Sequence, residues 1–355
     1  YVLAELVKAG APKEIKYEAK PHVGTDILKD VVKNIRKQII ALGGEVRFSS
    51  KLEYIKSNDG KVKSIVVNGD EIPCEALVLA LGHSSRDTYE MLNNIGIFME
   101  PKAFAIGVRI EHPQEMINIG QYGKMASHPR LQAASYNLTY QSRALGRGVY
   151  SFCMCPGGVV VAAASEEKRL VSNGMSYHAR DKENSNSALV VTVGPEDFEG
   201  SSVLRGMEFQ RHYEALAYKV GGGNYNAPVQ LLGDFVNDRK STKLGAVIPS
   251  YEPGFEFADM RECLPSYVVD GIKDGVNNFD RKIKGYGRED AVLTGIETRT
   301  SAPVKITRNE RLESISLSGL YPCGEGAGFA GGIVSAAVDG IKVAERIIEK
   351  YSAIQ

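Results

Sequence analysis

The chain has 355 residues, more than a single hydrophobic core usually takes, so its length predicts two domains. Apolar residues make up 43% of it, and 43 basic side chains balance 43 acidic ones, which argues against a nucleic-acid partner, including tRNA. No apolar run is long enough to cross a bilayer, so we expect no membrane association. Five cysteines without a paired framework favour a reducing compartment, and we expect a cytoplasmic location.

Helical periodicity dominates the first part of the chain. Apolar residues at helical spacing predict a helix over residues 2–9, which Gly10 ends, and a second helix over 27–42. The turn at Gly24-Thr25 precedes the second helix. It is either a plain N-terminal cap or a loop that approaches a bound cofactor.

Short strands follow between residues 45 and 75, separated by Asn-Asp-Gly turn signals, and they predict a small antiparallel unit. Residues 76–80 form a continuous apolar run, as expected of a buried parallel strand. The run ends in Gly82 and His83. Gly82 permits a close backbone approach to a ligand, whereas His83 either contacts a phosphate or simply begins the next loop.

From about residue 101 the pattern becomes a mixture of strands, helices and irregular loops, one of which spans 172–187. We interpret this region, up to residue 287, as an inserted domain that divides the rest of the chain in two. Its predicted strands span 104–110, 148–152 and 159–164, and its predicted helices span 206–218 and about 267–283.

Two cysteines stand two residues apart in this region, at Cys153 and Cys155, before a Pro-Gly-Gly turn. On a regular strand both thiols point to the same face. They are either a redox or nucleophilic pair, serving in persulfide or thiol transfer, or small apolar residues of a half-buried strand. Two ligands are too few for a structural zinc site, and the six histidines are not spaced as a metal set.

Arginines supply the candidate anion contacts. Arg299 lies in a Thr-rich segment and would hold a substrate carboxylate bidentately, unless it is a solvated side chain on a Thr-rich strand. Arg109, on an apolar strand, is a second candidate. The polar segment 178–181 either lines a substrate entrance or is a solvated loop. A Ser hydrolase elbow is absent, which favours chemistry carried by a cofactor.

The most informative segment lies near the end of the chain. A strand toward Tyr321 leads into a loop with five glycines between Gly324 and Gly332, and a helix follows from Ile333 to about Lys350. Such a loop presents free N–H groups and a partial positive charge, which suit a phosphate or an electron-rich ring. One carboxylate, Glu325, would repel phosphate there but would accept hydrogen bonds from sugar or ribityl hydroxyls.

This segment resembles the second FAD-contacting motif of flavoproteins with the glutathione-reductase-like fold, in particular a branch of uncharacterised bacterial FAD-dependent dehydrogenases. The resemblance implies an α/β protein, with an incomplete FAD/NAD(P)-binding dinucleotide domain at 1–100 and 288–355 and an inserted mixed α+β substrate domain at 101–287. Matching motifs lie at 20–26, 80–87, 153–158 and 297–303. The residues expected to bind the cofactor are Gly82, His83, Gly324, Glu325, Gly326, Gly331, Gly332 and Ile333, and the catalytic candidates are Cys153, Cys155 and Arg299.

Proteins of this type carry, at their N-terminus, a strand that runs into a G-x-G-x-x-G phosphate fingerprint, with an acidic residue about 20 positions later. We find no such unit in the N-terminal part of this sequence, and the glycine run 221–223 is followed by loop residues. We therefore expect a fragment that lacks the first βαβ unit. The predicted function is an FAD-dependent oxidoreductase that transfers a hydride from a small organic substrate to the flavin. The alternative is a catalytically silent fragment, or a flavin-free binding module.

Overall fold

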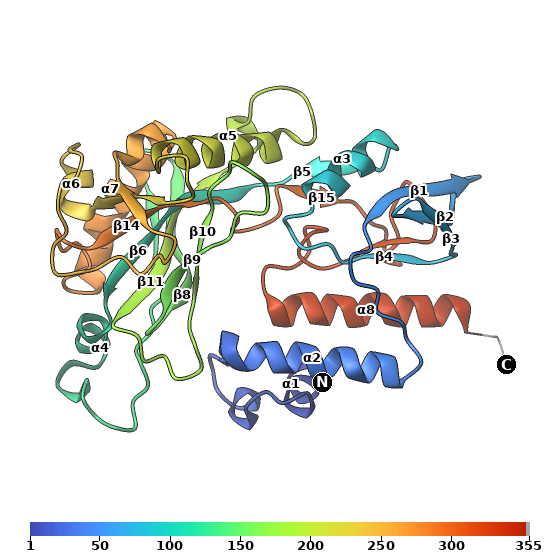
Figure 1. The fold of residues 1–355 in the computed structure, drawn as a ribbon, viewed down its shortest axis with the longest axis horizontal. Helices are drawn as coiled ribbons and strands as arrows, with labels where there is room; N and C mark the ends of the chain where they lie inside the picture. Colours follow the sequence, from blue (N-terminus) through green and yellow to red (C-terminus); the bar gives the residue numbers. More distant parts are fainter. Residues whose placement is uncertain (353–355) are drawn as a thin grey trace.

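The computed structural model describes residues 1–352 and shows a mixed α/β fold, so the predicted fold class is confirmed. A seven-stranded sheet with its helices forms one half of the molecule, and smaller sheets with two helices form the other (Figure 1). None of the helices among these residues has both the length and the apolar content that a membrane crossing needs.

The large sheet is antiparallel except at one edge, where β12 and β13 run parallel. Its centre is the long pair β6 and β11, whose ten residues each are in register from Phe104 opposite Val193 to Pro113 opposite Asn184. The strand order is β13 (Phe255–Phe257), β12 (Ala227–Leu231), β14 (Val292–Glu297), β6 (Phe104–Pro113), β11 (Asn184–Val193), β8 (Arg147–Cys155) and β7 (Thr139–Ser142).

The two faces of this sheet differ in what covers them. On β6, Phe104, Ile106, Val108 and Ile110 face the main hydrophobic core, to which helices α5 (Arg205–Val220) and α7 (Ser266–Lys282) also contribute. The opposite face carries Arg109 together with smaller residues, and the hairpin of β9 (Val159–Ala162) and β10 (Ser172–Met175) lies against it. This second face leads to the candidate site.

The smaller half contains three short sheets. Strands β1 (Leu52–Asn58), β2 (Lys61–Val67) and β3 (Asp70–Pro73) form the predicted antiparallel unit. Strand β4 (Leu77–Leu79) pairs in parallel with β16 (Leu320–Pro322), as predicted for the run 76–80, although Val78 is 41% exposed because the strand is not covered on both faces. Strand β5 (Met99–Pro101) pairs with β15 (Val304–Ile306), and α3 (Arg86–Asn94) and α8 (Ile333–Tyr351) complete this half.

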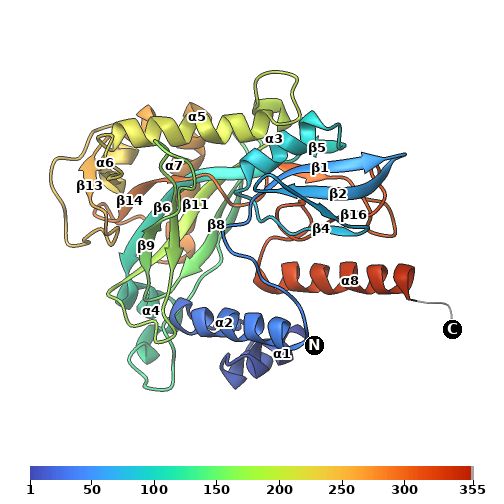
Figure 2. The same ribbon diagram turned by 45° about the vertical axis from the view of Figure 1, so that its right-hand side comes forward.

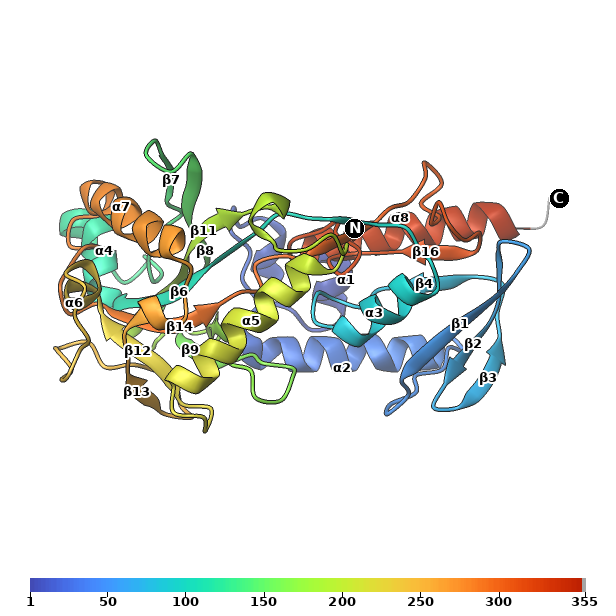
Figure 3. The same ribbon diagram turned by 90° about the horizontal axis from the view of Figure 1, so that it is seen from above.

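Figure 2 shows this smaller half beside the large sheet, with α8 on one side and α2 (Thr25–Ala41) nearer the large sheet. The first helix, α1 (Val2–Lys8), contacts α8, and α2 begins where Thr25 N–H donates to the carbonyl of Ser176 at 3.2 Å. Seen from above, α3 lies beside the N-terminal part of α5 (Figure 3). The remaining helical segments are α4 (Gln114–Tyr122), α6 (Leu232–Val236) and short 3-10 turns at Lys13–Lys16, Gly123–Met125, Pro195–Asp197 and Met260–Glu262.

Three expectations from the sequence are wrong. Residues 46–48 form no strand, and Phe48 is 70% exposed. The supposed loop 172–187 contains β10 and the start of β11, because its small polar residues are buried and form hydrogen bonds there. Strand β14 belongs to the large sheet, which therefore extends to Glu297, ten residues beyond the expected boundary at 287.

Candidate functional site

The glycine-rich loop lies directly against the end of β4. A methyl group on Gly326 would clash with the backbone of Gly82, because no side chain fits between the two segments. The Tyr89 hydroxyl on α3 donates to the carbonyl of Gly326 at 2.7 Å and fixes this approach. Gly324 and Gly328 adopt positive φ angles of 72° and 87°, which glycine reaches without strain. The structure thus brings together two segments that lie about 240 residues apart in sequence.

The far end of the loop opens to solvent at the N-terminus of α8. A Cβ on Gly331 would meet no atom within 4 Å, and Ile333 is 62% exposed. No side chain caps the helix, because Ser335 Oγ donates to the Gly332 carbonyl instead of accepting from a backbone N–H. The first-turn N–H groups, which have no partner within the helix, therefore face open space.

Glu325 and His83 face each other where the loop meets the end of β4. His83 Nε2 lies 3.9 Å from Glu325 Oε1, and His83 Nδ1 lies 3.1 Å from Ser84 Oγ. Burial lowers the pKa of His83, and the charge of Glu325 opposes this only in part. His83 is therefore neutral at physiological pH, and the Glu325 carboxylate keeps its capacity to accept hydrogen bonds.

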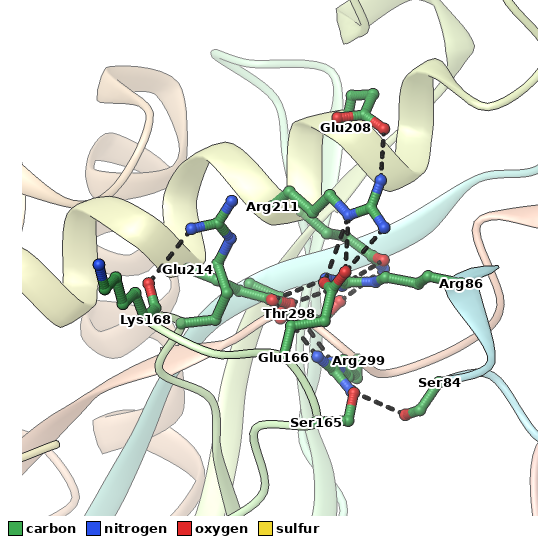
Figure 4. A network of polar contacts seen from close by, with 12 residues as sticks. Ser84, Arg86, Ser165, Glu166, Lys168, Glu208, Arg211, Glu214, Thr298 and Arg299 are labelled. Carbon is green, nitrogen blue, oxygen red and sulfur yellow. Dashed lines mark hydrogen bonds and ion pairs between the residues drawn. The ribbon is translucent and has the colours of Figure 1, made fainter. Parts of the chain in front are cut away.

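Arg299 takes part in a buried ionic network rather than pointing into an open cleft (Figure 4). Its Nη1 donates to Ser84 Oγ and Ser165 Oγ, both at 2.7 Å. Its Nε and Nη2 each donate to the Glu214 carboxylate at 3.3 Å. Arg299 thus already holds a carboxylate, which belongs to the protein. Its contact with Ser84 ties the network to the loop that carries His83.

Glu214 is the centre of that network. Arg86 donates to it twice, at 2.7 and 2.8 Å, and Thr298 Oγ1 donates at 2.7 Å. Burial alone would raise the pKa of Glu214, but the hydrogen bonds and charges of Arg86 and Arg299 outweigh it and hold the pKa below its usual value. The network connects α5, the start of α3 and the segment after β14.

The two cysteines do not share one face of a regular strand. A β-bulge interrupts the pairing of β8 with β11, since Cys155 pairs with Asn186 while Phe152 pairs with Ala188. Cys153 lies within the bulge at φ 45° and is exposed, whereas Cys155 is buried. The expectation from strand alternation fails here because the bulge inserts an extra residue.

Arg109, the second anion candidate, is fully buried beneath this bulge. Its guanidinium donates to Asn186 Oδ1 and to the carbonyl of Cys153, and lies 3.5 Å from Glu297. A substrate anion does not reach it. Of the segment 178–181, the residues 178–180 line a cavity of about 370 Å³.

Comparison with known proteins identifies the family. The chain matches the family described as FAD-dependent protein, C-terminal domain-like, over residues 103–300. The chain belongs to this family of FAD-dependent proteins. An uncharacterized protein of Clostridium beijerinckii is 74% identical over 351 residues; the match covers 99% of this chain and 66% of the relative, so the chain spans somewhat less than two thirds of the relative's length.

Two solved structures are more distant in sequence. CtdE in complex with FAD is 10% identical, with a TM-score of 0.34, and the match covers 90% of this chain and 59% of CtdE. Glycine oxidase from Bacillus cereus is 11% identical, with a TM-score of 0.36, and the match covers 91% of this chain and 57% of the oxidase.

Several residues that shape the site of this family member escape detection in the sequence. Asp339 on α8 accepts the N–H of Gly324 at 2.7 Å and pairs with Arg308, whose guanidinium also stacks on Phe329. A signal for Asp339 does exist, because it is an acidic residue within the apolar periodicity of the last helix. Glu214 and Tyr89 carry no comparable signal, since each resembles an ordinary residue of an amphipathic helix.

The close approach of Gly326 to Gly82 gives a test of the loop geometry. Gly326→Ala should lower the free energy of unfolding by about 1–3 kcal/mol, because the new methyl group forces the two backbones apart. Gly331→Ala is the matched control, since a Cβ there meets open space, and it should stay within about 0.5 kcal/mol of the wild type. Urea unfolding of both variants measures the difference; equal stabilities would contradict the packing described here.

Proposed function

We propose that this family member, as part of its whole protein, is an FAD-dependent oxidoreductase that takes a hydride from a small organic substrate. The observation that carries the proposal is the open N-terminus of α8 at Gly331 and Gly332, at the end of a loop whose Gly326 packs on the end of β4. Family membership supports FAD as the cofactor. The dinucleotide domain would then comprise 1–100 and the residues after β14, 298–355, with the substrate side on the large sheet.

The residues at the loop fit a flavin. The glycines leave room for a ring, and the free N–H groups from Ile333 onward suit its electron-rich edge. Glu325 would accept hydrogen bonds from ribityl or ribose hydroxyls, because its carboxylate is half-exposed and forms no hydrogen bond among the described residues. When bound, the flavin supplies the hydride acceptor.

Several side chains of this chain shape the proposed flavin site. Neutral His83 adds no charge beside Glu325, and Tyr89 and Asp339 hold the loop against α3 and α8. Arg299 acts as a positioning residue, since it holds Ser84 next to His83. Cys153 is the catalytic candidate that is exposed to solvent, whereas Cys155 is buried.

One feature of the sequence favours a second candidate function for these 355 residues. Their only G-x-G-x-x-G spacing, at 326–331, lies in the terminal loop, and none follows a strand in the N-terminal part, so the diphosphate contacts of a first βαβ unit would be missing. A chain that binds no flavin would be a silent fragment or a flavin-free binding module. FAD binding by this chain separates the two candidates.

The test is a titration of FAD into this chain, followed by flavin fluorescence, beside purification of the full-length Clostridium relative. We expect the relative to purify yellow, and this chain to bind FAD with a Kd that Glu325→Ala weakens about tenfold, since a charge-assisted hydrogen bond contributes about 1.5 kcal/mol. Glu349→Ala, at the other end of α8, should leave the Kd unchanged. A colourless relative that binds no FAD would refute the proposal, and a yellow relative beside an inert chain would favour the second candidate.

A further inference from the structure

We propose that Cys153 is the nucleophile of a thiol-exchange site, in which an adjoining cationic cavity selects disulfides of small anionic thiols. The inference goes beyond the flavin chemistry proposed above and does not depend on it. The cavity measures about 380 Å³, and Cys153 lines it together with Lys20, Arg180 and the apolar surfaces of Phe152 and Tyr136.

The β-bulge explains why one cysteine reaches this cavity and the other does not. Cys153 has no cross-strand partner in the register between β8 and β11, and its positive φ turns the residue out of the ladder. Cys155 returns to the ladder opposite Asn186 and is 7% exposed. The pair is therefore asymmetric, with one accessible thiol and one buried thiol.

The Pro-Gly-Gly turn after the cysteines brings Arg180 to the same place. A Cβ on Gly157 would clash with the carbonyl group of Arg180, so only glycine allows the two loops to meet. The N–H of Lys182 donates to the carbonyl of Gly157 at 3.2 Å and closes this contact. The turn thus brings Arg180 to the wall of the cavity that Cys153 also lines.

Buried charge favours the thiolate form of Cys153. The adjacent Cys155 thiol, which donates to the carbonyl of Cys153 at 3.4 Å, and the positive charge of Arg109 lower the pKa of Cys153 to about 6, against the opposing effects of burial and of Glu325. The pKa of Cys155 is raised well above its ordinary value, by its hydrogen bond with Cys153 and by burial. At neutral pH Cys153 is therefore the nucleophile, and Cys155 remains a protonated hydrogen-bond donor.

The cavity wall supplies positive charge for the ligand. Arg180 donates to Gln132 Oε1 at 3.1 Å and Lys20 donates to Ser135 Oγ at 3.1 Å, and both partners are neutral. Within residues 1–352 neither cation forms a salt bridge. Burial lowers the pKa of the Arg180 guanidinium, and the charge of Glu18 opposes this only in part. His22, which also lines the cavity, has a pKa lowered by burial and adds no positive charge at neutral pH.

The reaction is a balanced exchange. The Cys153 thiolate attacks one sulfur of a disulfide R–S–S–R, a new S–S bond joins Cys153 to one RS group, and the other leaves as the thiolate RS⁻. Cys153 is oxidised and the departing RS group is reduced. No further oxidant takes part, and a free thiol reverses the step. Carboxylates on R would pair with Lys20 and Arg180.

Two aromatic disulfides test the proposal on the full chain: dithiobis(nitrobenzoate), which carries two carboxylates, and dithiodipyridine, which is neutral. We expect Cys153 to react first with both reagents, as peptide mass spectrometry of the adducts will show, and Cys153→Ser to abolish the fast phase. Arg180→Gln should slow the dianionic reagent roughly fivefold and the neutral one less than twofold.

Two further variants test whether the positive charge of the cavity causes the selectivity. Lys20→Gln, at an exposed residue, should repeat the selective effect of Arg180→Gln even if the latter disturbs its loop. Lys182→Gln is the matched control, because Lys182 lies on the same loop as Arg180 but does not line the cavity. A fast adduct on half-exposed Cys74, or an equal slowing of both reagents by Arg180→Gln and by Lys20→Gln, would overturn the proposal.

Discussion

Glu214→Gln should lower the free energy of unfolding by about 3–5 kcal/mol, the usual cost of leaving buried charges without their partner. The Glu214 side chain has no exposed surface, and it accepts hydrogen bonds from Arg86, Arg299 and Thr298 (Figure 4). Glutamine keeps the shape but removes the negative charge between two buried guanidiniums. It also turns one acceptor into a donor that would face them.

Urea unfolding at neutral pH measures this effect, and Glu208→Gln provides the matched control. Glu208 lies on the same helix, α5, and pairs with Arg211, but its side chain is 60% exposed. Exposed pairs contribute little, so this variant should stay within about 0.5 kcal/mol of the wild type. If both variants are equally stable, the buried network does not hold α3 and α5 together.

Most of the correct predictions came from regular apolar patterns in the sequence. The five helices expected from periodicity are all present, because an apolar stripe at helical spacing requires a surface to cover it. The strands β4 and β16 were each predicted from their apolar runs, and the structure shows that they pair in parallel. The close approach of the loop at Gly326 to Gly82 agrees with the interpretation of both as parts of one site.

Buried polar residues account for the failures. The strand that begins at Asn184 looks like a loop, because its Asn and Ser residues form hydrogen bonds inside the protein with groups far away in sequence. The buried ion pairs of Arg86 and Arg109 are hidden for the same reason. Their partners, Glu214 and Glu297, lie more than 120 residues away, and no local pattern reveals such a pair.

The second large effect should be an acid-dependent loss of stability caused by His112. This residue lies on β6 and is fully buried; its Nε2–H donates to the carbonyl of Tyr286 at 2.7 Å, and its Nδ1 has no partner among the described residues. Burial lowers the pKa of His112 to about 4 from an ordinary 6.5, and the charges of Arg288 and Asp290 act in opposite directions. The folded protein therefore keeps this imidazole neutral.

The direction of this pH effect on stability follows from the linkage between proton binding and folding. Below pH 6.5 the unfolded chain binds a proton at His112 that the folded protein does not bind until about pH 4, so stability falls as the pH decreases through this window. The loss amounts to about 2.5 kcal/mol at pH 4.5 relative to pH 7.5. His112→Gln, whose amide N–H still reaches toward the Tyr286 carbonyl, should lose this component. Urea unfolding at the two pH values should give a correspondingly smaller difference for this variant. His128→Gln removes an exposed histidine and should follow the wild type; the same acid dependence in His112→Gln and in the wild type would show that another group governs it.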